Sequence, residues 1–232
     1  MNLTQLIEQR QIPQMALVVY KNDKTGGVYM ESHRINEQGR MLAGQPLTLK
    51  CITELAESFS AEQNNAPHGK IPLTMLYCDT RKGHERYVWY NPPCKRMMFF
   101  SKRLNIDNRE YYLPGIIYDT DGDNLNVYAF KGEKPKSESK LYKTPLFNVT
   151  DESVCLGNVE INFPDNPTFE NYILYWEKKF WQTEFSHLGG NRNPTKNNLV
   201  TVTKSMENAF DYNELIPFKE NGKIQTLNDL LK

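Results

Sequence analysis

The chain has 232 residues, of which 39% are hydrophobic, and its 28 lysines and arginines balance its 28 aspartates and glutamates. This hydrophobic share is sufficient for a folded core, which excludes a wholly disordered chain, while a net charge of zero argues against nucleic acid or anionic lipid as a partner. No apolar stretch has the length of a signal-peptide core or of a membrane span, so we expect a cytoplasmic protein with reduced thiols and no membrane association.

The first third of the chain is predicted to form strands and then a helix. An apolar run at residues 14–21 and an alternating segment at 26–35 flank the turn-forming sequence NDKTGG, which predicts a β-hairpin. In the sequence at 46–59, apolar residues recur every three or four positions, as in an amphipathic helix. We therefore expect an N-terminal β elaboration over residues 1–45 and a main domain over 46–232, unless the two form one continuous domain.

The middle of the chain is predicted to form antiparallel strands. Three segments rich in branched and aromatic residues, LTMLYCDT, RYVWYNPP and KRMMFFSK, are candidate strands, and a Pro-Pro pair interrupts this run. The clearest hairpin lies at residues 112–130, where two apolar runs flank an Asp-Gly turn. Its acidic DTDGDN sequence lacks the glycine and glutamate spacing of a helix–loop–helix calcium site. One more strand is expected at 140–149.

The last third is predicted to be helical. From Phe169 onward, aromatic and branched residues recur every three or four positions, which predicts a long helix. The sequence GGNRNP at 189–194 is expected to end it, because glycine favours a helix stop and proline the first turn of the next element. A second helix at 195–206 and a short one at 226–232 are expected to follow. Strands followed by helices are typical of the α+β class.

The cysteines and histidines do not predict a metal site. The four cysteines show no CxxC spacing, and the four histidines are scattered along the chain. Cys51 and Cys78 lie in apolar surroundings and are predicted to be structural. Cys94 precedes a lysine and an arginine, which would favour a thiolate, but adjacent residues of a strand point to opposite faces.

Cys155 has two interpretations. A cysteine between Val154 and Leu156 is typically a small buried hydrophobic residue. The flanking sequences TDES and GN, however, are typical of turns, and Gly157 permits unusual backbone dihedrals. Asn148 lies seven residues upstream, and its amide can donate a hydrogen bond to the oxyanion that forms when a cysteine attacks a carbonyl. Cys155 is thus either strand packing or a nucleophile at the rim of a loop.

The segment that contains this cysteine, PLFNVTDESVCLGNV, resembles the active-site stretch of ubiquitin-conjugating enzymes. There a strand leads into His-Pro-Asn, a turn and then a cysteine; here no His-Pro precedes Asn148. Together with WYNPPCKRMMFFS and KKFWQTEFSHLGGNRNPTKNNLV, it is more closely similar to the PRTRC system protein B family, over most of residues 70–210. This resemblance implies an α+β fold in which helices flank an antiparallel β-meander, here with an N-terminal strand and helix elaboration.

The resemblance also implies partners and a reaction. Members of that family occur on mobile elements with a ThiF-like activating enzyme, a small ubiquitin-like protein and a RadC/JAB-like protein. By this comparison Cys155 would carry the ubiquitin-like protein as a thioester and transfer it, and Asn148 would support the oxyanion. His187 or Asp151 would assist proton transfer or orient the loop, although a histidine near a helix end can also be a simple C-terminal cap. The resemblance implies no cofactor and no metal on this chain. ATP would be used by the activating enzyme. The alternative is a non-catalytic scaffold of the same fold that docks the activating enzyme or other PRTRC proteins.

Overall fold

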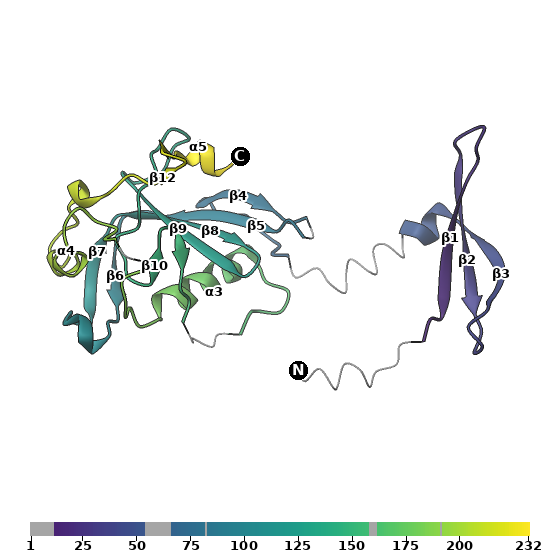
Figure 1. Ribbon diagram of the computed structural model, residues 1–232, viewed down its shortest axis with the longest axis horizontal. Coiled ribbons are helices and arrows are strands. Elements are labelled where there is room, and N and C mark those ends of the chain that lie inside the picture. The colour runs from purple at the N-terminus through teal and green to yellow at the C-terminus, as the bar shows by residue number, and fades with distance from the viewer. Residues whose placement is uncertain (1–11, 54–65, 82, 158–161, 191) are drawn as a thin grey trace. The chain divides into compact units, whose positions relative to one another are not determined.

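The computed structural model divides the chain into two units, residues 1–64 and 65–232 (Figure 1). The residues that it describes are 12–53, 66–81, 83–157, 162–190 and 192–232. The predicted boundary between residues 45 and 46 falls inside strand β3 (Met41–Leu47), so the N-terminal unit extends beyond it. Among the described residues, no helix is both long and apolar enough to cross a membrane.

The N-terminal unit is a three-stranded antiparallel sheet with the order β1-β2-β3. Strands β1 (Met15–Lys21) and β2 (Val28–Ile35) form the predicted hairpin. Its turn closes through hydrogen bonds between Asn22 and the two glycines of NDKTGG, and Gly26 has a φ of 70°, which glycine adopts without strain. Residues 49–53 are helical, and the rest of the expected helix lies outside the described residues.

The second unit contains a six-stranded antiparallel sheet with the order β10-β11-β9-β8-β5-β4. Its strands are β4 (Met75–Asp79), β5 (Arg86–Asn91), β8 (Gly115–Asp121), β9 (Asn124–Phe130), β10 (Val149–Thr150) and β11 (Ser153–Val154). Strands β6 (Cys94–Met98) and β7 (Arg109–Leu113) form a separate hairpin between β5 and β8 in the sequence. The predicted hairpin around the Asp-Gly turn is confirmed as β8 and β9, with Gly122 at a φ of 57°.

The helices of this unit are few and short. They are α3 (Phe169–Trp181), α4 (Leu199–Ser205) and α5 (Leu227–Leu230), with 3-10 turns at Lys102–Leu104 and Tyr212–Glu214. A small hairpin, β12 (Lys219–Glu220) and β13 (Lys223–Ile224), precedes α5. The unit therefore combines antiparallel sheets with a few helices, which is consistent with the fold of ubiquitin-conjugating enzymes.

Two sequence predictions were wrong in this unit. Residues 140–149 do not form one strand, because only Val149 belongs to a strand, β10, and the bridges made at Lys140 and Tyr142 are isolated. Tyr142 exchanges hydrogen bonds with Ala129 of β9, while the residues on either side of it bond the C-terminal segment. The helix that begins at Phe169 ends at Trp181, well before the Gly-Gly pair. Residues 184–187 leave the helical path because Glu184, Ser186 and His187 bond Asn148, as described below, and Phe185 bonds the backbone at residues 99 and 101.

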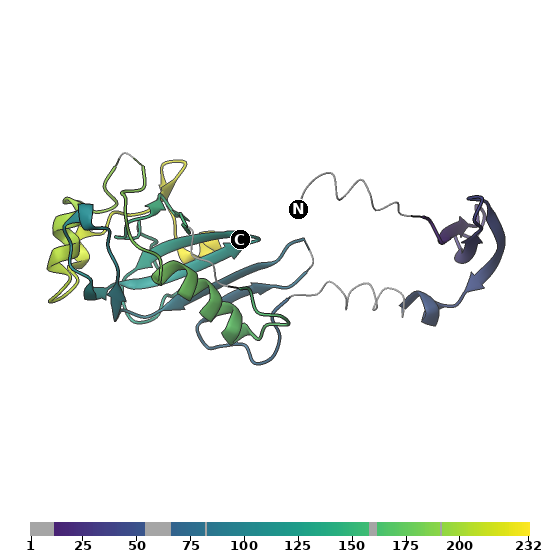
Figure 2. The ribbon, with the colours of Figure 1, turned by 90° about the horizontal axis from the view of Figure 1, so that it is seen from below.

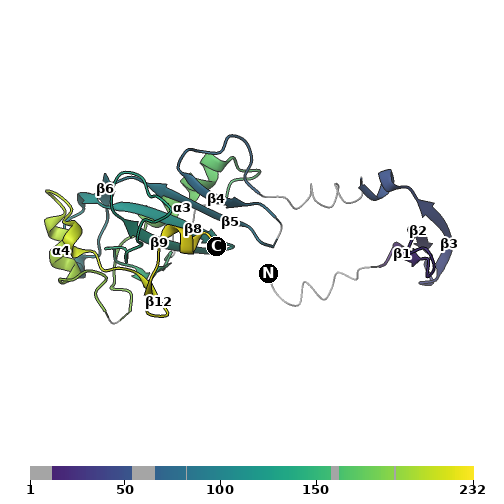
Figure 3. The same ribbon diagram turned by 90° about the horizontal axis from the view of Figure 1, so that it is seen from above.

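The central sheet is covered on both faces (Figures 2 and 3). Alternating residues of a strand point to opposite faces, so Trp89 and Tyr118 stack in the cluster beneath α3, with ring centroids 5.1 Å apart. Their neighbours Val88 and Ile117 join a second cluster on the other face, which Leu227 of α5 completes. Helix α3 thus packs on one face of the sheet and α5 on the other.

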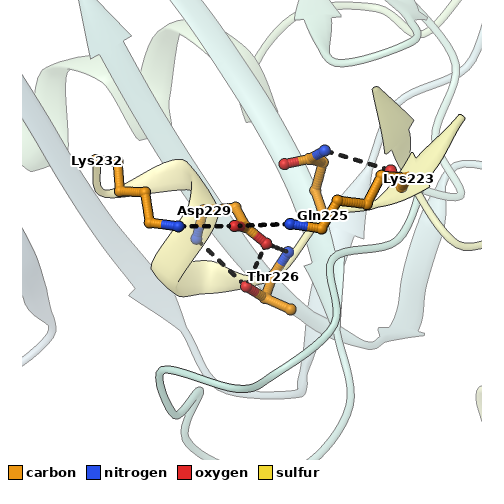
Figure 4. Close-up of polar contacts among 5 residues, drawn as sticks. All are labelled: Lys223, Gln225, Thr226, Asp229 and Lys232. Atoms are coloured by element: carbon orange, nitrogen blue, oxygen red, sulfur yellow. Dashed lines mark hydrogen bonds and ion pairs between the residues drawn. The ribbon is translucent and has the colours of Figure 1, made fainter. Parts of the chain in front are cut away.

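Helix α5 is held by a capping box (Figure 4). The Asp229 carboxylate accepts hydrogen bonds from the Thr226 hydroxyl at 2.7 Å and the Thr226 amide at 3.2 Å, and pairs with Lys232 at 3.1 Å and Lys223 at 3.3 Å. The bonds from Thr226, followed by the one from Lys232, hold the pKa of Asp229 well below its ordinary value.

This capping box predicts a pH-dependent contribution to stability. A carboxyl whose pKa is lower in the folded state stabilises the fold above its unfolded pKa of about 4, and the contribution is lost as the pH falls through the folded value. We expect Asp229→Asn to lower the melting temperature at pH 7, with the gap to wild type closing as the pH is lowered below 4. Thermal melts followed by tryptophan fluorescence measure it. Asp123→Asn, in the exposed β8–β9 turn, is the control; an equal gap at every pH would contradict the prediction.

Candidate functional site

Cys155 follows a short hairpin at the edge of the central sheet. Strands β10 and β11 pair Val149 with Val154, and the Cys155 amide continues the pairing by donating to the Asn148 carbonyl at 2.8 Å. Asp151, with a φ of 55°, begins the turn between the strands. Strand β11 joins the sheet through β9, so the sheet edge holds the hairpin.

Cys155 is not part of a buried strand. The residue is outside the strand and exposed, at the start of the loop that follows β11. Among the other cysteines, Cys51 is exposed in the N-terminal unit, while Cys78 and Cys94 are partly buried. Burial raises the pKa of the Cys78 thiol above its usual value, with a smaller effect from Asp79, which disfavours the thiolate. Cys155 is therefore exposed where its interpretation as strand packing requires burial.

Asn148 is buried and its amide holds the backbone that follows α3. It is 3% exposed and has a φ of 59°. Its Nδ2 donates to the Glu184 carbonyl at 3.0 Å, and its Oδ1 accepts from the amides of Ser186 at 2.9 Å and His187 at 3.2 Å. The side chain expected to support an oxyanion therefore fastens the hairpin to residues 184–187.

His187 lies next to Asn148 and bonds it through its backbone. Besides its amide contact, the His187 carbonyl accepts from the Asn148 amide at 2.9 Å. Its side chain is exposed, and Nδ1 lies 3.0 Å from the Ser186 hydroxyl. The alternative of a helix cap is wrong, because α3 ends at Trp181, well before His187.

Asp151 lies at the turn end of the hairpin and is engaged in an ion pair. Its Oδ1 lies 2.5 Å from the Lys143 ammonium, and its side chain is 62% exposed. Both residues line a pocket of about 280 Å³ together with Gly189 and Arg192. Burial raises the pKa of the neighbouring Glu152 carboxyl. Asp151 thus lies in the turn of the hairpin, and Cys155 follows its second strand.

The sequence analysis missed two residues that join this hairpin to the chain after α3. Gly189 approaches the hairpin so closely that a Cβ atom on it would lie 1.8 Å from the Val149 carbonyl oxygen. The Thr183 hydroxyl lies 3.2 Å from the carbonyl oxygen of Leu156, directly after Cys155. The Gly-Gly pair was a sequence signal for the close approach of Gly189, although it was interpreted as a helix stop. Nothing in the sequence indicated the contact of Thr183 with Leu156.

Within the described parts of the chain, no group of three or more His, Cys, Asp or Glu side chains is placed to hold a metal ion. The family model described as prokaryotic E2 family D matches residues 51–218, a span that contains every site residue named above. No curated protein and no solved structure matches the chain.

Proposed function

The chain belongs to the prokaryotic E2 family D, and from this premise we propose that Cys155 carries a small ubiquitin-like protein as a thioester and transfers it. The family indicates a component of a ubiquitin-conjugation-type system, which in general works with an activating enzyme and a ubiquitin-like protein. The observation that carries the proposal is the exposure of Cys155 at the start of a loop. This loop follows a hairpin that strand β9 and residues 184–187 hold in place.

The proposed reaction has two steps at one sulfur. The Cys155 thiolate attacks the carbonyl carbon of the ubiquitin-like C-terminus, which the activating enzyme holds as a thioester; a new C–S bond forms and the activating enzyme's thiolate leaves. An amine, a water molecule or another thiol then attacks the same carbon. Its proton leaves to a base, the C–S bond breaks, and Cys155 leaves as a thiolate.

The surrounding residues support these steps in different ways. Asn148 keeps the hairpin and residues 184–187 together, so its main contribution is to hold the loop. His187 is exposed beside it and is our first candidate for the base that accepts the proton from the acceptor. Asp151 is the second candidate, and attack would require its carboxylate to separate from Lys143.

The partners follow from the resemblance to the PRTRC system protein B family. The activating enzyme would be ThiF-like, the cargo a small ubiquitin-like protein, and a RadC/JAB-like protein would belong to the same system. ATP would be consumed by the activating enzyme, so no cofactor is needed on this chain.

A charging assay tests the proposed function. We expect incubation with the cognate activating enzyme, the ubiquitin-like protein and ATP to give an adduct on a non-reducing gel that thiol reagents remove. Cys155→Ala should abolish this adduct completely, because no sulfur remains to form the thioester. Cys155→Ser should give an oxygen ester that resists thiols.

Cys51→Ala is the matched control, since Cys51 is also exposed but lies in the N-terminal unit. It should charge as the wild type does. An activating enzyme that is itself charged but yields no adduct with the wild-type chain would reject transfer in favour of the scaffold alternative.

A further inference from the structure

Thr183 lies at the junction between α3 and the Cys155 loop. It follows Gln182, the C-terminal cap of α3, and is 4% exposed. Its hydroxyl oxygen lies 3.2 Å from two carbonyl oxygens, that of Lys179 in the last turn of α3 and that of Leu156 in the loop. A hydroxyl has one proton, so α3 and the loop share the single hydrogen-bond donor of Thr183.

The same side chain also lies near Gly157, the residue after Leu156. A Cβ atom placed on Gly157 would lie 3.7 Å from the Thr183 oxygen and 3.9 Å from its methyl carbon. Gly157 has a φ of 60°, a conformation that glycine adopts without strain. Thr183 therefore bonds Leu156 and lies beside Gly157.

These contacts complete a two-sided support for the cysteine backbone. On its N-terminal side, the Cys155 amide donates to the Asn148 carbonyl at 2.8 Å. On its C-terminal side, Leu156 is held by the hydroxyl of Thr183. Cys155 itself is exposed, so these two contacts hold the main chain on either side of it.

We propose that Thr183 is a positioning residue for the thioester chemistry of Cys155, which it serves by tying the loop after the cysteine to the rigid end of α3. The inference rests on the proposed function and adds a residue to it. A nucleophile must approach the carbonyl carbon along a narrow direction at about 3–3.5 Å, so a loop that drifts lowers the rate of reaction without weakening partner binding.

The test compares Thr183→Val with Thr203→Val in the full chain. Valine has the shape of threonine but no hydroxyl. Thr203 is 1% exposed, and its hydroxyl makes the equivalent bond to the carbonyl four residues earlier, Leu199, at 2.8 Å. That bond stays inside α4. The control therefore removes a similar buried hydroxyl that, among the described residues, makes no hydrogen bond to the Cys155 loop.

We expect Thr183→Val to lower the maximal rate of Cys155 charging roughly tenfold at saturating activating enzyme, with little change in the half-saturating concentration. Thr183→Ser should restore the rate, because it keeps the donor, and Thr203→Val should charge normally. A wild-type chain that charges while Thr183→Val charges equally fast overturns the inference and leaves the proposed function intact.

A second readout needs no partner. Iodoacetamide alkylates free thiols, and peptide mass spectrometry measures the rate at Cys155 alone. Thr183→Val should change this rate and its pH profile, whereas Thr203→Val and Thr183→Ser should not. Identical Cys155 alkylation rates in all four proteins would overturn the inference, whether or not the wild-type chain is charged. Failure of the wild-type chain to be charged would separately reject the proposed function.

Discussion

Replacing Asn148 by alanine is expected to lower the free energy of unfolding by about 2–4 kcal/mol, because it strips three partly buried backbone groups of their hydrogen-bond partners. The amides of Ser186 and His187 lose their acceptor and the Glu184 carbonyl loses its donor. Urea denaturation followed by tryptophan fluorescence measures the change. All three tryptophans lie in the 65–232 unit, so the signal reports on the unit that contains the site.

The control for this substitution is Asn221→Ala. Asn221 also has a positive φ, 50°, but is exposed in the turn between β12 and β13. The strain of placing alanine at a positive φ is common to both variants, so the difference between them isolates the amide contacts. Asn148→Asp is the sharper variant, because it keeps the acceptor for two amides but sets a carboxylate oxygen against the Glu184 carbonyl. If Asn148→Ala unfolded like Asn221→Ala while losing charging, the asparagine would act on the oxyanion and not on the loop.

Asn148 also shows what sequence reasoning can and cannot reach at this site. The spacing of Asn148 and Cys155 on one turn-rich segment was readable, and the structure joins them through a backbone hydrogen bond. The direction of the Asn148 amide was not readable, because its partners lie in residues 184–187, far along the chain. A side-chain role that depends on a distant backbone segment leaves no local pattern in the sequence.

In the fold, too, features that depend on neighbouring residues were predictable and those that depend on distant segments were not. Hairpins whose turn chemistry is local, such as β1–β2 and β8–β9, were predicted correctly because a Gly-containing turn between apolar runs is sufficient. The segment at 140–149 was predicted as a strand from its composition, yet its first residues bridge β9 and the C-terminal region and its last residue pairs with β11. Helix α3 began where the periodicity predicted and ended early, since residues 184–187 bond Asn148 and the segment at 99–101.

Two of the motifs that carried the family resemblance meet in the core, around Glu177 of α3. One Glu177 oxygen accepts from Asn91 at 2.8 Å and from the indole of Trp89 at 3.3 Å. The other lies 3.2 Å from Arg96, whose guanidinium carbon lies 4.8 Å from the centroid of the Trp181 ring. The Glu177 side chain is 15% exposed and that of Arg96 is 26% exposed. One carboxylate thus fixes α3 to strands β5 and β6.

We expect Glu177→Ala to lower the free energy of unfolding by roughly 3 kcal/mol, because it leaves a mostly buried arginine without its counter-ion and two donors without an acceptor. Glu177→Gln should cost less, since it keeps one acceptor for Asn91. Urea denaturation followed by tryptophan fluorescence gives both values.

Glu170→Ala is the matched control, because Glu170 is an exposed acid in the first turn of the same helix. There we expect a loss of at most about 1 kcal/mol, from the helix dipole. The double variant Glu177→Leu with Arg96→Met should recover much of the loss, because a buried ion pair is often replaced by apolar residues at little net cost. An equal cost for Glu177→Ala and Glu170→Ala would show that the pair adds nothing to the docking of α3. The position of the Thr183 hydroxyl beside the Cys155 loop would then depend on the apolar packing of the helix alone.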